Sequence, residues 1–410
     1  MKLKFFLCFL VLPFIISCDQ LTDDQQEVKA IPLKASMQKR VQQDNDFSFD
    51  LFKKVLAESE EKNIFISPLS VSIALGMTWN GAVGNTKTEM ETALKMSGMT
   101  VKDINEYYQI LLTNLPKVDK STQLNIANSI WYKQGYPVKS DFLKINTDYF
   151  NTEVSDLDFS DPKSLDIING WCAKQTNDLI KEPLDEIRAD AIMYLINAIY
   201  FKGIWTKQFD KKLTYDANFY AEDNKTTQVK MMQQKESFKY AEDENAQYLD
   251  LPYGNKAFSM TVILPKDKMT TTEVLNSIDT KKWNAIVNSS SQEVRVYLPK
   301  FKVQAKYLLN DALKSMGMIE AFSIWANFTG IADADADLSI SRVIHNTYCD
   351  VNEEGTEAAA VTIVEIIETS MPIDNTPVFN ANRPFIFVIR ENSTGIILFM
   401  GKMGEVEMYD

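Results

Sequence analysis

Apolar residues recur along this chain at two spacings, which predict a mixture of helices and strands. Phe47, Leu51 and Val55 repeat every four residues, so we expect a helix over 44–60 that Asp44 or Asn45 could cap. Continuously apolar short runs predict buried strands. We expect such strands over 124–132, 192–201, 258–265, 294–303, 383–389 and 396–401, and further helices over 165–177, 272–278 and 281–287.

The stretch 63–82 predicts a short strand followed directly by a buried helix. Pro68 suits the first turn of a helix, and the residues after it are apolar on nearly every face. Ser70 and Ser72 lie within this helix and would therefore need hydrogen-bond partners. We find no internal repeat, low-complexity block or interior linker in the chain, which favours one large mixed domain.

The segment 353–377 combines two preferences that disagree. Gly355 and the alanines at 358–360 suit a mobile hinge, whereas the β-branched run over 361–367 suits a strand. Successive side chains of a strand face opposite ways. The face that begins with Thr356 is free of charge up to residue 366, and the glutamates of this span fall on the other face. The segment could be an exposed loop, or a central strand if room opened for it.

The first residues form a targeting segment. Lys2 and Lys4 precede an apolar run over 5–16 that is too short to span a membrane. The run ends at Ser17 and Cys18, which resemble a bacterial lipobox, in which the cysteine is lipidated and becomes the first residue. An ordinary secretory signal with an incidental cysteine is the alternative. We expect a signal peptide over 1–17, a lipid anchor and flexible tether over 18–43, and a single domain over 44–410.

Composition and charge narrow the function. The 410 residues are 45% hydrophobic and 24% charged, as in ordinary soluble globular proteins. The net charge of −13 disfavours nucleic acid as a partner, because phosphates call for basic patches. Cys172 and Cys349 remain after the predicted processing, and we expect two buried thiols rather than a disulfide, although export would permit one.

The residues do not favour catalysis or metal binding. A hydrolase triad needs a base, most often histidine, and His345 is the single histidine of the chain. Cys349 is close in sequence, but four residues along one strand separate two side chains by about 13 Å. The acidic run over 333–337 has the spacing of a calcium loop but lacks its glycine and its final glutamate. We therefore expect no enzymatic activity, no metal site and no cofactor.

Several motifs together resemble the serpin family over the span from about residue 44 to the end of the chain. Each motif is weak alone, but their order and span are specific. They are Ser-Pro-Leu-Ser at 67–70, Asn-Gly-Ala at 80–82, the run at 197–203 followed by Trp205, the segments 340–345 and 353–360, Arg-Pro-Phe at 383–385, and 398–402.

The resemblance implies an α+β serpin fold with three β-sheets, eight to nine helices and an exposed reactive-centre loop at about 353–377. It also implies a suicide inhibitor of serine endopeptidases, with cysteine endopeptidases as a further target class. In that mechanism the protease is trapped as an acyl-enzyme while the cleaved loop inserts into the central sheet. A non-inhibitory serpin whose loop is merely a substrate is the alternative.

The resemblance also assigns residues to sites. In the family a hinge glutamate precedes the cut by seventeen positions, which makes Thr369–Ser370 the expected bond when Glu353 is counted first. Ile367 and Glu368 are adjacent candidates because the segment after the bond looks longer than usual. The hinge residues would be Glu353, Gly355, Thr356, Glu357, Ala358, Ala359 and Ala360. The region where the sheet opens would comprise Ser67, Ser70, Asn197, Trp205 and His345.

These assignments imply the partners. Thr369 suits a protease with a small or medium S1 pocket, which favours elastase-like or subtilisin-like enzymes in a covalent complex. Lipid on Cys18 would attach the protein to a membrane, and the expected location is the bacterial cell envelope, on the outer-membrane surface. We expect a monomer.

Overall fold

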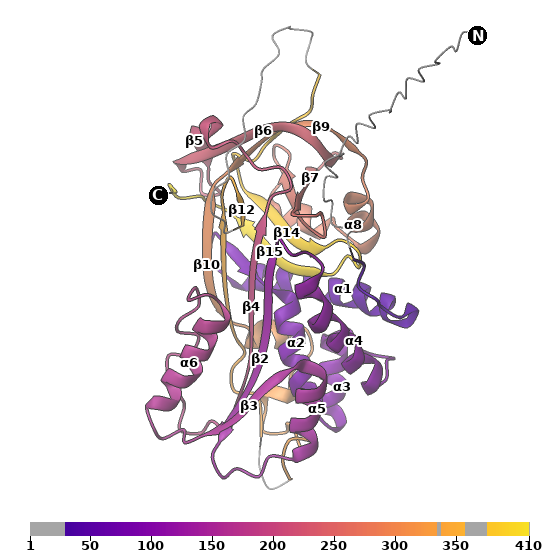
Figure 1. Cartoon of the computed structure of the whole chain (residues 1–410), viewed down its shortest axis with the longest axis vertical. Coiled ribbons are helices and arrows are strands. Elements are labelled where there is room, and N and C mark those ends of the chain that lie inside the picture. The colour runs from indigo at the N-terminus through magenta and orange to yellow at the C-terminus, as the bar shows by residue number, and fades with distance from the viewer. Residues whose placement is uncertain (1–28, 334–337, 357–374, 410) are drawn as a thin grey trace, which may run out of the picture.

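The computed structural model describes residues 29–333, 338–356 and 375–409. The predicted signal peptide and Cys18 lie outside these residues, as do Glu357, Ala358, Ala359 and Ala360 of the hinge. Ile367, Glu368, Thr369 and Ser370, the candidates for the reactive bond, also lie outside them. The described part of the chain contains two hydrogen-bonded groups of strands, and most of its helices lie around one end of the molecule (Figure 1).

A sheet of six strands runs along the long axis of the molecule (Figure 1). Its neighbours pair antiparallel except for the last two strands, which are parallel. The two-residue strand β12 lies between two long strands near one end of the sheet, and this position is central to the candidate site. The order is β10 (Phe301–Leu308), β11 (Ile344–Val351), β12 (Gly355–Thr356), β4 (Met193–Ile204), β2 (Gln123–Lys133) and β3 (Thr152–Leu157).

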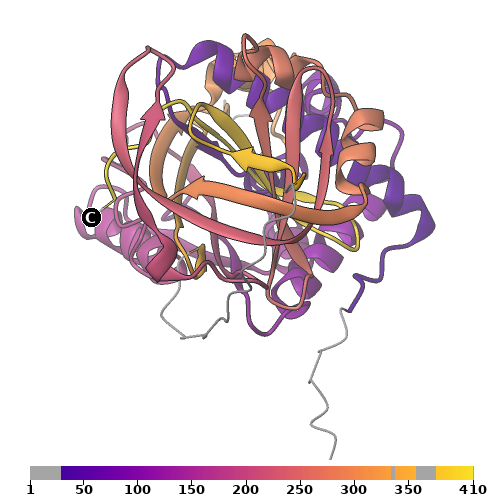
Figure 2. The ribbon, with the colours of Figure 1, turned by 90° about the horizontal axis from the view of Figure 1, so that it is seen from above.

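The other strands form a second hydrogen-bonded network at the opposite end from most helices, and its long strands curve across the molecule (Figure 2). Their order is β1 (Ile64–Ile66), β15 (Ile397–Met403), β14 (Phe385–Glu391), β8 (Phe258–Pro265), β7 (Ala246–Tyr253), β6 (Thr226–Glu242), β9 (Ser291–Pro299) and β13 (Val378–Asn380), and β5 (Tyr215–Tyr220) also pairs with β6. The three expected sheets therefore appear as two networks. The reason is that the long strand β6 pairs with β5 and β9 along most of its length and with β7 at its end.

The described residues form nine α-helices, in agreement with the expected eight to nine. They are α1 (Ala35–Glu58), α2 (Pro68–Trp79), α3 (Gly84–Ala93), α4 (Val101–Asn114), α5 (Ser140–Phe150), α6 (Lys163–Gln175), α7 (Thr271–Asn276), α8 (Thr280–Val287) and α9 (Asn310–Ser315). None of the described helices is both long enough and apolar enough to cross a membrane.

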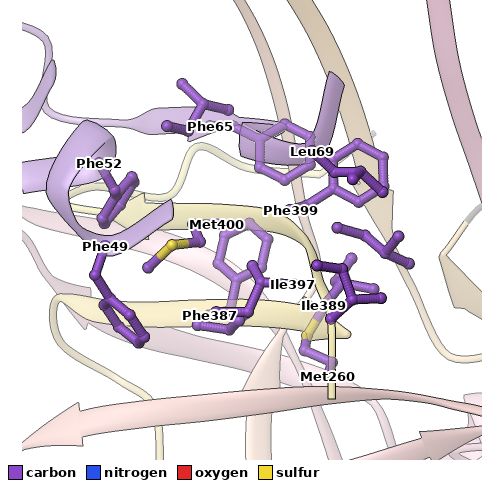
Figure 3. Packing of buried hydrophobic residues seen from close by; sticks show 14 of the residues in the cluster. Phe49, Phe52, Phe65, Leu69, Met260, Phe387, Ile389, Ile397, Phe399 and Met400 are labelled. Carbon is purple, nitrogen blue, oxygen red and sulfur yellow. The ribbon is translucent and has the colours of Figure 1, made fainter. Parts of the chain in front are cut away.

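The core lies between α2, α1 and the paired strands β14 and β15. Every residue of α2 except Ala74 is buried, as its apolar sequence predicts. The ring of Phe65 stacks on those of Phe387 and Phe399, with centroids 5.5 and 5.3 Å apart (Figure 3). Aromatic pairs at these distances stabilise beyond the area that they bury. Helix α2 packs against β15 of the second network, and the residues at its N-terminus are placed accordingly.

Two expected elements are wrong in their bounds. The first helix begins at Ala35 rather than at residue 44, because Met37, Arg40 and Val41 are buried. The guanidinium of Arg40 donates to the carbonyl oxygens of Leu94 and Lys95, both at 3.0 Å. A buried charged residue therefore attaches the end of the expected tether to the fold. The expected strand over 294–303 is two strands, since Lys300 separates β9 from β10.

Other expectations are confirmed. The expected strands at 124–132, 192–201, 258–265, 383–389 and 396–401 correspond to β2, β4, β8, β14 and β15 within a few residues. Ser72 has partners, as its burial requires: its hydroxyl donates to Asp44 Oδ1 at 2.9 Å and lies 2.7 Å from the hydroxyl of Tyr108. Cys172 and Cys349, both in the described part of the chain, are buried, and no disulfide joins them.

Candidate functional site

We call residues 352–356 the root of the predicted loop. Gly355 and Thr356, its last two residues, are already part of the six-stranded sheet. Thr356 of β12 pairs with Val351 of β11 on one side and with Gly203 of β4 on the other. Gly355 has φ +153°, and a Cβ there would lie 2.0 Å from the carbonyl oxygen of Gly203. Only glycine fits this position, because a side chain would collide with the backbone of β4.

The side chain of Thr356 points into the protein. Thr356 is 3% exposed, and its hydroxyl lies 2.7 Å from the hydroxyl of Tyr253. The Tyr253 ring stacks on Trp205 with centroids 4.3 Å apart and planes 12° from parallel. Burial raises the pKa of the Tyr253 hydroxyl, which therefore stays protonated and able to exchange a hydrogen bond with Thr356. The charge-free face predicted for the segment thus turns inward at its first residue.

The two glutamates before β12 are buried and each has a cationic partner. Thr214 donates to Glu353 Oε1 at 2.9 Å, and Lys300 Nζ lies 3.1 Å from Glu353 Oε2. Burial alone would raise the pKa of Glu353, but the hydrogen bonds from its own backbone, Thr214 and Lys300 outweigh it and lower the pKa. Glu354 forms an ion pair with Lys211. These contacts hold the root of the loop against elements on both sides of β12.

Backbone amides of the segment that follows β4 donate hydrogen bonds to the root of the loop. The amide of Trp205 donates to the carbonyl oxygen of Glu354 at 2.8 Å, and the amide of Phe209 donates to that of Glu353 at 2.9 Å. The indole of Trp205 donates to the carbonyl oxygen of Asn352 at 3.0 Å. Trp205 therefore contacts the root of the loop through both its backbone and its side chain.

Ser67, Ser70, Asn197 and His345 are brought together in a hydrogen-bonded chain that connects β11, α2 and β4. The amide of Ser67 donates to His345 Nε2 at 2.9 Å, and the Ser70 hydroxyl donates to Asn197 Oδ1. Ser67 also caps α2, because its Oγ accepts the amide of Ser70 at 3.2 Å. The sequence did not identify Asn128 of β2, whose Oδ1 accepts from Asn197 Nδ2 at 2.6 Å. The same strand also contains Asn125 and Ser129, so polarity alone does not single out Asn128.

A cavity of about 390 Å³ lies between β4 and β11. Ser70, Asn197 and His345 are among its lining residues. Among the described strands, β12 alone pairs with this side of β4, and it does so only at Gly203 and Ile204. The facing parts of β4 and β11 thus border a slot that continues the direction of β12.

We expect the stability of the fold to fall as the pH drops from about 6.5 to about 4. Burial lowers the pKa of His345 from its ordinary 6.5 to about 4. Between these values the unfolded chain binds a proton that the folded chain does not, so the folded state loses about 3 kcal/mol across the window. Urea unfolding at several pH values measures this loss. The difference from His345→Gln isolates the histidine, and equal pH dependence in both proteins would contradict the assignment.

In the part of the chain that the structure describes, no group of three or more His, Cys, Asp or Glu side chains is arranged to hold a metal ion. Of the acidic run that has calcium-loop spacing, residues 334–337 lie outside the described ranges. The side chains that do gather in the described site are hydrogen-bonding groups on either side of a slot in a sheet.

Comparison with known proteins agrees with this geometry. A family model described as serpin (serine protease inhibitor) matches residues 42–406. The chain is 35% identical to Serpin B4 of Homo sapiens over 87% of this chain and 96% of that protein, and 37% identical to a leukocyte elastase inhibitor of Equus caballus over the same shares. It also resembles the native state of tengpin, a thermophilic serpin, with a TM-score of 0.83 and 34% identity over 92% of this chain and 96% of that one. The description of the matched family is that of inhibitors of proteases rather than of enzymes. The chain therefore belongs to the serpin family.

Proposed function

We propose that this serpin is a suicide inhibitor of serine endopeptidases, with cysteine endopeptidases as a further target class. The observation that carries the proposal is the position of β12 between β11 and β4. A strand has begun at the root of the loop, and a slot of about 390 Å³ lies between the same two long strands. Residues that follow Thr356 would only have to continue this strand.

The proposed reaction begins as ordinary proteolysis. The nucleophile of the protease attacks the carbonyl carbon of Thr369, the amide bond breaks, and the amine of Ser370 leaves with a proton. The carbonyl carbon of Thr369 remains bonded to the nucleophile of the protease as an acyl-enzyme. Insertion from Thr356 to Thr369 lays down roughly 14 residues at about 3.3 Å each, or on the order of 45 Å of strand. The protease would be carried that far before water could release it.

The hinge sequence suits this movement. Gly355 and Thr356 fit the close approach to β4, and Ala358 and Ala360 would follow Thr356 on the inward face because side chains alternate along a strand. Ala359 and Glu357 would fall on the other face. A large or charged side chain at an inward position would be buried without a partner, which costs free energy.

We propose that Ser67, Ser70, Asn197 and His345 exchange hydrogen bonds as the strands separate, and that Trp205 marks the point where insertion begins. The support is geometric. The first group joins β11, α2 and β4 across the cavity, whereas Trp205 donates hydrogen bonds to the carbonyl oxygens of Asn352 and Glu354 at the root of the loop. About eight residues of β4, or roughly 26 Å, separate Asn197 from Trp205, so an inserting strand would pass Trp205 first.

The proposed targets are elastase-like and subtilisin-like enzymes, because Thr369 is of small to medium size. The leukocyte elastase inhibitor of Equus caballus, a relative of this chain, is named for such a protease. A cut after Ile367 would also suit an elastase-like enzyme, and one after Glu368 would suit a glutamate-specific protease. Mass spectrometry of the released peptide identifies the bond.

Incubation with an elastase and a subtilisin, followed by denaturing electrophoresis, tests the proposed function. We expect a covalent complex that survives boiling in detergent. A protease whose nucleophilic serine is replaced by alanine is the matched control and should give no such band. Complete turnover of the loop without any complex would contradict inhibition and favour a serpin whose loop is only a substrate.

We also propose that the protein is a lipid-anchored monomer on the bacterial cell envelope, on the outer-membrane surface, with miropin as a near relative. The lipobox-like sequence that ends at Cys18 supports the anchor. Cys18→Ala should abolish incorporation of labelled palmitate. Equal labelling of this variant would contradict lipidation at Cys18.

A further inference from the structure

We propose that Tyr409, in the segment that follows β15, is a positioning residue for the root of the loop. Together with Lys300, Lys302 and Asp350 it forms a cluster that we call the clasp. The consequence for inhibition rests on the proposed function, whereas the contacts themselves do not. None of the motifs that resemble the family includes Tyr409.

The ring of Tyr409 lies against two ammonium groups. Lys300 Nζ is 4.2 Å from the ring centroid, and Lys302 Nζ is 4.5 Å from it. The negative face of an aromatic ring attracts cations at such distances, and the attraction is stronger where water is excluded. The ring therefore attracts both ammonium groups.

The hydroxyl of Tyr409 ties the same ring to the sheet. It donates to Asp350 Oδ1 at 2.5 Å, and Asp350 lies on β11, two residues before Asn352. Asp350 Oδ2 is in turn 3.5 Å from Lys302 Nζ. Lys302 and Asp350 are also register partners of β10 and β11. Tyr409 thus fixes the ends of two paired strands where the chain turns toward β12.

Lys300 carries the effect from the clasp to the hinge. Its ammonium lies between the Tyr409 ring and Glu353 Oε2, at 3.1 Å from the latter. Tyr409 also lines a cavity of about 230 Å³ with Glu353, Glu354, Lys211 and Asn352. Without the ring, one wall of this cavity would open to water and the long side chain of Lys300 would gain rotamers, which weakens its hold on Glu353.

Side chains on both sides of the slot bind Glu353 and Glu354. Lys300 and Asp350 belong to the β10–β11 side, whereas Lys211 and Thr214 follow β4 and bind Glu354 and Glu353 from the other side. The root of the loop therefore bridges the two strands that must part. Loosening the clasp allows β12 to leave its register before a protease has cut the loop, so a larger fraction of the protein is lost to turnover or inactivation.

Hydrogen exchange of the uncleaved full chain tests the clasp directly. The amides of Trp205 and Phe209 donate to the carbonyl oxygens of Glu354 and Glu353, so peptides over 203–209 report on the root of the loop. In Tyr409→Ala we expect these amides to exchange about three- to tenfold faster, the loss of protection that one such cation contact supports. Tyr409→Phe keeps the ring and should lie between the wild type and the alanine variant.

Met408→Ala is the matched control, because Met408 is the neighbouring residue and is 59% exposed. It should exchange as the wild type does. Unchanged exchange in Tyr409→Ala, or the same increase in Met408→Ala, would overturn the proposal. The stoichiometry of inhibition supplies the second readout and should rise in Tyr409→Ala. If the wild type forms no covalent complex, the proposed function fails while the exchange data still decide on the clasp.

Discussion

Replacing Thr356 by arginine should convert this serpin from an inhibitor into a substrate. The Thr356 side chain is 3% exposed and lies against the fully buried Tyr253, whose hydroxyl is its partner. A guanidinium there would have to be buried without an anion or would hold β12 out of the slot. We expect the stoichiometry of inhibition to rise by at least about tenfold, which corresponds to about 1.4 kcal/mol of partitioning.

Titration of a fixed amount of protease with the inhibitor measures this stoichiometry. Thr356→Ser keeps the hydroxyl that meets Tyr253 and should behave as the wild type does. The rate of cleavage should be the same in all three proteins, since the expected bond lies thirteen residues beyond Thr356 in the sequence. An arginine variant that inhibits with unchanged stoichiometry would contradict the role given to the hinge.

Cutting the loop should raise the thermal stability of the protein. Insertion would fill a cavity of about 390 Å³ and pair the facing parts of β4 and β11. Filling that volume is worth up to about 9 kcal/mol at about 24 cal/mol per Å³. For a chain of this size that free energy corresponds to a rise in Tm of about 10 °C or more.

Calorimetry of the intact and cleaved proteins measures this shift. Cleaved Thr356→Arg is the control, and its Tm should rise much less because the charged hinge blocks insertion. A cleaved wild type that melts at the same temperature as the intact protein would mean that the loop does not join the sheet. Such a result would favour the non-inhibitory alternative.

Local patterns in the sequence predicted much of the fold. The buried strands β8 and β14 are mostly apolar, and α2 is apolar on nearly every face, so their types could be identified from the sequence alone. The start of α1 could not, because Arg40 is charged and is buried only through an ion pair with Asp44 and carbonyl oxygens near residue 94. The joining of two expected sheets by β6 depends on pairing at long range, which no local pattern encodes.

Some residues of the candidate site could be predicted from the sequence, and others could not. Ser67, Asn197 and His345 could be located from their motifs, and the structure brings them together. Tyr253 and Lys300 could not, because they meet the hinge from segments that are distant in sequence and no spacing rule connects them. Tyr409 stands apart from every motif, and its position against two lysines follows only from the three-dimensional arrangement.

Hydrogen exchange of β4 and β11 before and after cleavage tests most directly whether the loop becomes a strand between them. In the intact protein, the amides of β4 that face β11 below Gly203 should exchange readily, because β12 pairs with this side only at Gly203 and Ile204. After the cut, we expect strong protection along the facing parts of both strands and in residues 357–369. Exchange that is unchanged in both strands after complete cleavage would contradict it.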